Sequence, residues 1–150
     1  MKLAAQNKSA QFEYFIEEVI EAGIVLTGSE VKSVRNGLIS ITESFAGAMA
    51  NDATAIYLFN AQIQNYENAR DLKYEPKRPR KLLLKKRQNR KLLGQVARKG
   101  YSLVPLKVYF NERGILRLSL AVGKGKKWHD KRATIKEREW QRSKARRAFE

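Results

Sequence analysis

A ten-residue stretch near the end of the chain carries the side chains best suited to chemistry. It reads G-K-G-K-K-W-H-D-K-R from Gly123 to Arg132, and a basic tail follows it. Lysine and arginine displace counterions from phosphates, and the rings of Trp128 and His129 offer flat faces on which a base can stack. The pattern favours contact with nucleic acid; a solvated, solubilising terminus is the alternative.

The same stretch offers little for catalysis. His129 beside Asp130 could act as the acid–base pair of a nuclease, because histidine titrates near neutral pH. Adjacent residues in a tail are poorly held for that work, since catalysis depends on groups fixed in a pocket. With 1 histidine and 0 cysteines, the chain predicts no metal site and no cofactor. We expect a protein that is not an enzyme.

The positive charge is concentrated in two blocks within a chain of net charge +16. Residues 1–72 have 5 basic and 9 acidic side chains (net −4), whereas 73–99 have 12 and 1 (+11) and 124–150 have 11 and 4 (+7). An acidic half joined to two basic blocks indicates an electric field directed at a polyanion. Nucleic acid is favoured over an anionic membrane surface, because no basic segment has a continuous apolar stripe.

Length and hydropathy favour one cytoplasmic domain. A chain of 150 residues suffices for a single core. No apolar run approaches the roughly 20 residues of a membrane span, and the N-terminus lacks the apolar core of a signal peptide.

The first elements that would position these groups are an arm and a long strand. Residues 1–11 are expected to form a mobile or draped N-terminal arm. An extended pattern starts at Phe12 and bends at Gly23. It places four residues on one face: Tyr14, Ile16, Ile20 and Ala22.

A short helix and a meander come next. The spacing predicts a helix over 29–36, with Thr27 to Ser29 as its cap, Gly37 as its stop and Arg35 on its open side. Strands are predicted over 45–50 and 55–63 and a long loop over 65–79.

The last elements flank the second basic block. Residues 80–84 fit a strand or a helix equally well, and a helix is predicted over 86–99. The final hairpin joins 104–110 to 116–122, with Val104, Leu106, Val108 and Phe110 expected to share its inward face. Gly114 is expected to absorb an odd residue in a left-handed conformation.

These elements predict a mainly β fold with short helices. The expected architecture is a small antiparallel barrel of the oligonucleotide-binding type over 12–123. The arm at 1–11 precedes it and a basic tail at 124–150 follows. In the tail, Ile135 and Trp140 are too isolated to hold a helix on a core, so we expect a segment that is disordered when free and becomes helical on a polyanion.

The chain resembles the small protein B family over nearly its whole length. The resemblance is carried by an ordered series of motifs: N-K at Asn7 and Lys8, Y-F-I-E-E at 14–18, E-A-G-I-V-L-T-G at 21–28, E-V-K-S at 30–33, R-K-L-L-L at 80–84, V-P-L at 104–106, the stretch 123–132, and I-K-E-R-E-W ending at Trp140. An apolar residue is usual in the family where Asn89 stands, and the arm is usually more basic after Lys8.

The resemblance implies an adaptor that binds the tRNA-like part of transfer-messenger RNA (tmRNA) and brings it to stalled ribosomes. The implied partners are tmRNA, the rRNA of the small ribosomal subunit and, through the charged RNA, elongation factor Tu, with the protein acting as a monomer. A constitutive ribosomal or ribosome-assembly protein remains the alternative from another class, and a tail-dependent nuclease the third.

Two groups of site residues follow from this resemblance and from the charge pattern. The first is expected to contact the RNA and comprises Asn7, Lys8, Tyr14, Glu21, Arg35, Arg80, Lys81, Leu83, Lys124, Gly125, Lys126 and Lys127. Glu21 could accept hydrogen bonds from a base edge, and Leu83 could pack on an unstacked base. The second is expected to occupy the decoding centre and mRNA channel and comprises His129, Asp130, Lys131, Arg132, Lys136 and Trp140.

Overall fold

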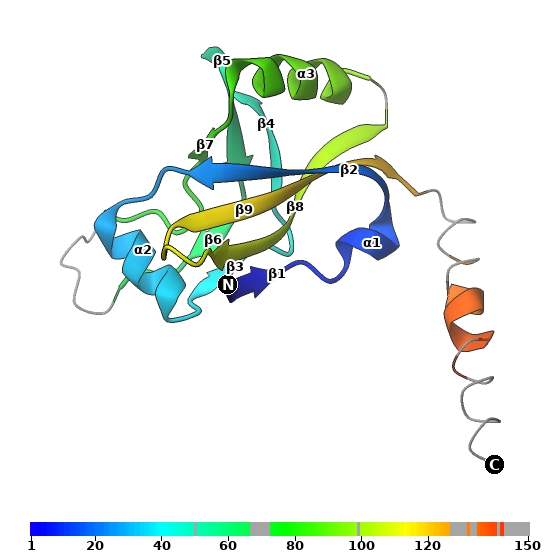
Figure 1. Ribbon diagram of the computed structural model, residues 1–150, viewed down its shortest axis with the longest axis horizontal. Helices are drawn as coiled ribbons and strands as arrows, with labels where there is room; N and C mark the ends of the chain where they lie inside the picture. The colour runs from blue at the N-terminus through cyan, green and yellow to red at the C-terminus, as the bar shows by residue number, and fades with distance from the viewer. Residues whose placement is uncertain are drawn as a thin grey trace.

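The structure is a computed structural model that describes residues 1–49, 51–66, 73–98, 100–126, 132, 135–140 and 142. Within these residues, six strands pair in a closed antiparallel ring in the order β8, β4, β5, β7, β2 and β9, with β9 returning to β8. The bounds are β2 Tyr14–Ile24, β4 Phe45–Met49, β5 Asp52–Phe59, β7 Arg80–Leu83, β8 Tyr101–Phe110 and β9 Leu116–Gly125. The predicted mainly β architecture is confirmed (Figure 1).

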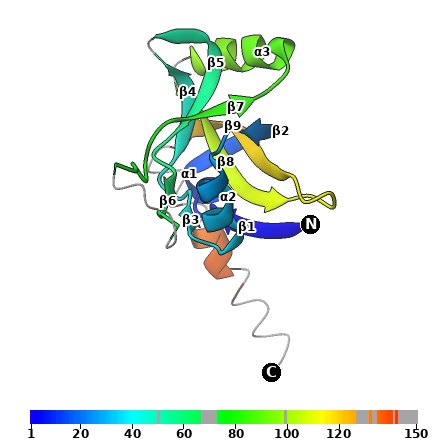
Figure 2. The ribbon, with the colours of Figure 1, turned by 90° about the vertical axis from the view of Figure 1, so that its left-hand side faces the viewer.

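The helices that pack around the barrel in the described part of the chain are α1 Ala10–Glu13, α2 Gly28–Arg35 and α3 Lys86–Val96. Figures 1 and 2 both place α3 at one end, with α2 and β1 toward the other. The predicted helix at α2 is confirmed, and its cap is Thr27, which accepts a hydrogen bond from the Glu30 backbone while Glu30 bonds the Thr27 backbone. This reciprocal capping box satisfies two otherwise unpaired N–H groups. The helix stops at Gly37, where φ is 74°.

The predicted strands and turns are largely confirmed. A single meander strand expected over 55–63 is divided into β5 and a short β6, Gln62–Ile63, which pairs with β3, Ile39–Ser40. Asn60 separates the two with a φ of 63°, a left-handed conformation that asparagine tolerates. The final hairpin pairs Phe110 with Leu116, and Gly114 has the expected positive φ of 75°.

The N-terminal arm is draped over the barrel as regular structure. Residues Lys2–Gln6 form β1, which pairs antiparallel with β8, and α1 follows directly. Neither element was predicted, because β1 is short and its mixture of apolar and polar residues has no clear period of two. Of the two forms predicted for the arm, the structure therefore shows the draped one and not the mobile one.

Two bulges change the expected facing of side chains. The register between β2 and β9 shifts between Ile16 and Glu18, and the register between β8 and β9 shifts between Pro105 and Lys107. One extra residue moves all following side chains to the opposite face. The predictions of one shared face for Tyr14 to Ala22 and for Val104 to Phe110 are wrong for this reason.

The bulges create two apolar clusters. The interior of the barrel is filled by residues after the bulges, among them Ile20, Val108 and Leu118, together with Leu92 of α3. Of the residues predicted to face inward, those at or before the bulges pack on the outside instead, together with Ala10 of α1 and Ala121; they are Tyr14, Ile16, Val104 and Leu106. The outer surface of the β2–β9–β8 sheet is thus apolar under α1 and polar beyond it.

Candidate nucleic-acid interface

Glu21 and Arg117 form the centre of the uncovered outer surface. They lie on β2 and β9, and the Arg117 Nε is 2.6 Å from Glu21 Oε1. The hydrogen bond from Arg117 holds the pKa of Glu21 below its ordinary value. Tyr109 of β8 adjoins the pair, and its own burial, followed by the nearby Glu21 charge, raises the pKa of the phenol. Glu21 therefore presents an ionised carboxylate with acceptor sites that remain open to a ligand.

Leu83 continues this surface across β7. Leu83 is 55% exposed, although its side chain has no group that can form a hydrogen bond with water. Leu83 pairs with Gly23 of β2, and a Cβ at Gly23 would lie 3.2 Å from Leu83 Cβ and 3.4 Å from Arg117 Nη1. Gly23 thus lets Arg117 and Leu83 approach each other, and an apolar side chain beside a charged pair suits an unstacked base.

Lys81 and Arg80 have opposite roles, although they are adjacent. Residues alternate sides along β7, with Arg80 and Leu82 buried and Lys81 and Leu83 exposed. Lys81 is exposed, so its ammonium is available to a phosphate. The prediction that Arg80 contacts the RNA is wrong, because its side chain is fully buried and bonds Glu30, Ala61 O and Pro76 O.

Asn7 attaches the N-terminal arm to β8 beside this surface. It is 7% exposed, its backbone N–H donates to Leu106 O at 2.7 Å, and its Nδ2 donates to Pro105 O at 3.2 Å. Its Oδ1 accepts from Ser9 Oγ. These bonds fix the arm on the bulge of β8 and leave the neighbouring Lys8 exposed, at the rim of a cleft with Lys107 and Ser119. Asn7 thus mainly holds the arm in place, whereas Lys8 is exposed to a ligand.

The start of the tail is tied to α1 and β2. The backbone N–H of Lys126 donates to Glu13 O at 2.8 Å, and its Nζ donates to Gln11 O at 3.1 Å. The same ammonium lies 4.9 Å from the centre of the Phe15 ring. Lys124 and Gly125 end β9 and are exposed. The start of the tail is therefore held on the folded domain as far as Lys126.

Tyr14 packs in the outer apolar cluster, and Arg35 lies over an aromatic ring at one end of β8. Tyr14 belongs to the outer apolar cluster, and a Cβ at Gly123 would lie 2.9 Å from Tyr14 Cβ, so its packing role is clear. Arg35 of α2 lies 5.5 Å over the Phe110 ring, at the hairpin end of β8. Lys124 is at the opposite end of β9, eight residues beyond Leu116, or about 27 Å along the strand. The structure does not bring Arg35 and Lys124 together.

The tail prediction is only partly covered by the described residues. Arg132, Lys136 and Trp140 are helical and exposed, and the guanidinium of Arg138 lies 5.6 Å over the Phe12 ring of α1. Residues 135–140 already have the helical conformation that was expected of the bound tail. Four predicted residues lie outside the described part: Lys127, His129, Asp130 and Lys131.

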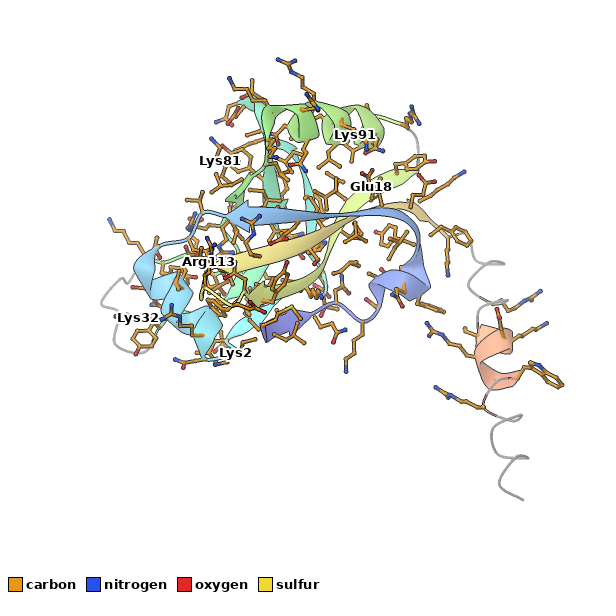
Figure 3. All side chains as sticks on the ribbon, in the orientation of Figure 1. Lys2, Glu18, Lys32, Lys81, Lys91 and Arg113 are labelled. Carbon is orange, nitrogen blue, oxygen red and sulfur yellow. The ribbon has the colours of Figure 1, made fainter. Side chains whose placement is uncertain are left out.

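Sequence reasoning missed three members of the surface. Arg117, Tyr109 and Lys107 were not among the predicted site residues, because their neighbours on β2 are close in space but far in sequence. The basic side chains of α3 are not all free of acidic partners. Lys91 pairs with Glu18 of β2, with 2.9 Å between Nζ and Oε1, and this hydrogen bond lowers the pKa of Glu18. Both side chains are labelled in Figure 3. In the part of the chain that is described, no helix is long and apolar enough to cross a bilayer.

Comparisons with known proteins show the family of this chain. The family model described as SmpB protein matches residues 4–150. The SsrA-binding protein of Rhodopseudomonas palustris (strain TIE-1) is 53% identical over 146 residues, which cover 97% of this chain and 91% of the relative. That of Bradyrhizobium diazoefficiens (strain USDA 110) is 55% identical over 146 residues, with the same coverage of 97% and 91%.

A solved structure also matches the chain. It is described as "tmRNA-SmpB: a journey to the center of the bacterial ribosome" and is 46% identical, with a TM-score of 0.66 over 82% of this chain and 84% of the other.

Proposed function

The chain belongs to the SmpB protein family, and on this premise we propose that it is an RNA-binding adaptor that binds the tRNA-like part of tmRNA and delivers it to stalled ribosomes. The observation that supports this most directly is the match over 97% of the chain with relatives named SsrA-binding proteins. The outer surface around Glu21, Arg117 and Leu83 supplies the chemistry: a carboxylate for a base edge, an apolar platform and flanking cations.

The barrel and the tail have different roles in this proposal. The barrel holds the tmRNA through Lys8, Glu21, Lys81, Leu83 and Arg117. The tail, which leaves from the far end of β9, enters the decoding centre and the empty mRNA channel, where His129 to Arg132, Lys136 and Trp140 contact small-subunit rRNA. An occupied channel excludes the tail sterically, so an occupied ribosome is not a target.

The remaining features of the proposal concern partners and place of action. The protein acts as a monomer in the cytoplasm, requires no cofactor or metal, and performs no catalysis itself. Elongation factor Tu joins the complex through the charged tmRNA. Peptide transfer is carried out by the ribosome.

A reconstituted rescue reaction tests this function. Ribosomes stalled on an mRNA without a stop codon are mixed with aminoacylated tmRNA, and addition of the tmRNA-encoded peptide is measured. The full chain should support tagging, whereas Lys131→Ala with Arg132→Ala should bind tmRNA normally and fail to tag. A constitutive ribosomal protein would instead bind the small subunit equally well without tmRNA and leave tagging unchanged.

A further inference from the structure

A cleft lies between β7 and α3, next to exposed Leu83. Four leucines form its apolar wall, namely Leu82, Leu83, Leu84 and Leu93, and three cations surround it, namely Lys81, Lys86 and Arg90. In the part of the chain that the structure describes, none of these cations forms an ion pair with a carboxylate. The cleft therefore combines an apolar interior with positive charge available for an anion.

Asn89 gives this cleft a specific polar group. Its side chain lines the cleft, and its Oδ1 is buried without a hydrogen-bond partner. A buried acceptor without a partner reduces stability, and most such groups in folded proteins are satisfied. Rotation of the Asn89 amide would bring this unpaired acceptor to the wall of the cleft, where a donor that arrives with a ligand can satisfy it.

We propose that the cleft binds one unpaired nucleotide of the RNA held by the barrel, with its base donating a hydrogen bond to Asn89 Oδ1. The leucines contact the face of the base, and Lys81, Lys86 or Arg90 contacts its phosphate. This inference rests on the proposed function, because it assigns a further contact to the same RNA. Adenine is the best match, since an asparagine amide can bond an adenine through one donor and one acceptor at once.

The composition of the cleft favours a nucleotide over a peptide. An apolar pocket flanked by one sign of charge is complementary to a flat ring attached to a phosphate. The cleft also adjoins the Leu83 platform, so an RNA strand on the Glu21 surface can continue into it. A base-paired nucleotide has its donor edge occupied, so the site selects a base that is out of the helix.

A double-mutant cycle tests this contact with the full-length protein. Fluorescence anisotropy at one fixed salt concentration measures binding of an adenosine hexanucleotide and of the same hexanucleotide built from N6,N6-dimethyladenosine. Dimethylation removes both amino hydrogens and keeps the ring and the charge. The wild-type protein should bind the unmodified RNA about 5- to 100-fold more tightly, the discrimination of one well-made base contact. Asn89→Leu should reduce that ratio to about 1.

A matched control and a stability measurement separate recognition from folding. Gln95 is a second amide of α3 with a buried, unpaired Oε1 and does not line the cleft, so Gln95→Met should keep the wild-type ratio. Asn89→Leu should also raise the melting temperature, because it removes a buried acceptor. A general loss of structure would lower the melting temperature and binding together, and Asn89→Ala repeats the test with a smaller side chain.

Two results would overturn the inference: a ratio near 1 in the wild type, or an unchanged ratio in both Asn89 variants. Binding of tmRNA and of an ordinary tRNA is measured in parallel. If the wild type prefers tmRNA while the hexanucleotide ratio is near 1, the cleft assignment fails and the adaptor function stands. If the hexanucleotide ratio is large but tmRNA is not preferred over tRNA, the adaptor function fails.

Discussion

Glu30 and Arg80 are 50 positions apart in the sequence and form an ion pair inside the protein, with 2.7 Å between Oε2 and Nη2 and no exposed side-chain surface on either partner. Glu30 also caps α2 and pairs with Arg78. Tyr74 adds a hydroxyl that donates to Ile63 O at 2.7 Å. This network attaches α2, β6 and the segment before β7 to one another, so it fixes the strand that carries Lys81 and Leu83.

Arg80 and Lys81 should respond in opposite ways to alanine substitution. Arg80→Ala removes a buried partner of the Glu30 carboxylate and should lower the free energy of unfolding by about 3–5 kcal/mol. Lys81→Ala should change stability by less than about 0.5 kcal/mol and reduce the salt slope of tmRNA binding by about 1. Urea unfolding and binding at several salt concentrations measure both. A stable Arg80→Ala protein with a reduced salt slope would restore Arg80 as a phosphate contact.

Acid should weaken the network around Glu30. Burial by itself raises the pKa of Glu30, but hydrogen bonds from the Thr27 backbone, Arg78 and Arg80 outweigh it and hold the pKa below the ordinary 4.5. A lowered folded pKa contributes stability that is complete above the unfolded pKa and disappears as the pH falls through the folded value. The difference in unfolding free energy between wild type and Glu30→Gln should be constant above about pH 5.5 and shrink below about pH 4.5. A difference that stays constant to about pH 2 would show that the charge of Glu30 contributes nothing.

Glu21 and Arg117 should act as one unit in RNA recognition. Glu21→Ala and Arg117→Ala should each weaken the preference for tmRNA over tRNA, and the double variant should be less impaired than the sum of the two predicts. Leu83→Ala should weaken binding without changing the salt slope, because no phosphate contact is lost. Competition binding with the two RNAs provides the measurement. Full additivity would mean that the pair is not used jointly.

Gly123 should tolerate no side chain. A Cβ there would lie 2.9 Å from Tyr14 Cβ, and such crowding in packed structure costs about 1–3 kcal/mol. Gly47 of β4 is the matched control, since a Cβ at that position meets nothing within 4 Å. Thermal unfolding should therefore separate Gly123→Ala from Gly47→Ala. Equal stabilities would mean that the β9 backbone moves freely away from Tyr14.

The local features of this fold were readable from the sequence. The capping pattern from Thr27 to Glu30, the stop at Gly37 and the odd residue at Gly114 each depend on a few neighbouring side chains, and each was predicted correctly. Positions set by distant partners were not. The bulges at β2 and β8 leave no sequence signal, because an extra residue is recognised only against the paired strand.

Arg80 illustrates why the candidate site was only partly predictable. A basic residue in a basic block is usually exposed, and its burial depends on Glu30, which is far away in sequence. Once residues 80–83 are known to be a strand, the alternation of sides separates Arg80 from Lys81 directly. Arg117 was missed because its partner Glu21 belongs to another strand that is far away in sequence.

Binding by the chain shortened after Lys126 tests the division between barrel and tail most directly. The cut leaves β9 complete and keeps the bond from Lys126 to Glu13, so the barrel retains its contacts. Affinities of the full and shortened proteins for tmRNA and for an ordinary tRNA are measured at two salt concentrations. We predict that both proteins prefer tmRNA to a similar degree. Loss of all preference in the shortened protein, with its β structure intact by circular dichroism, would make the tail the reader of the RNA and contradict the account.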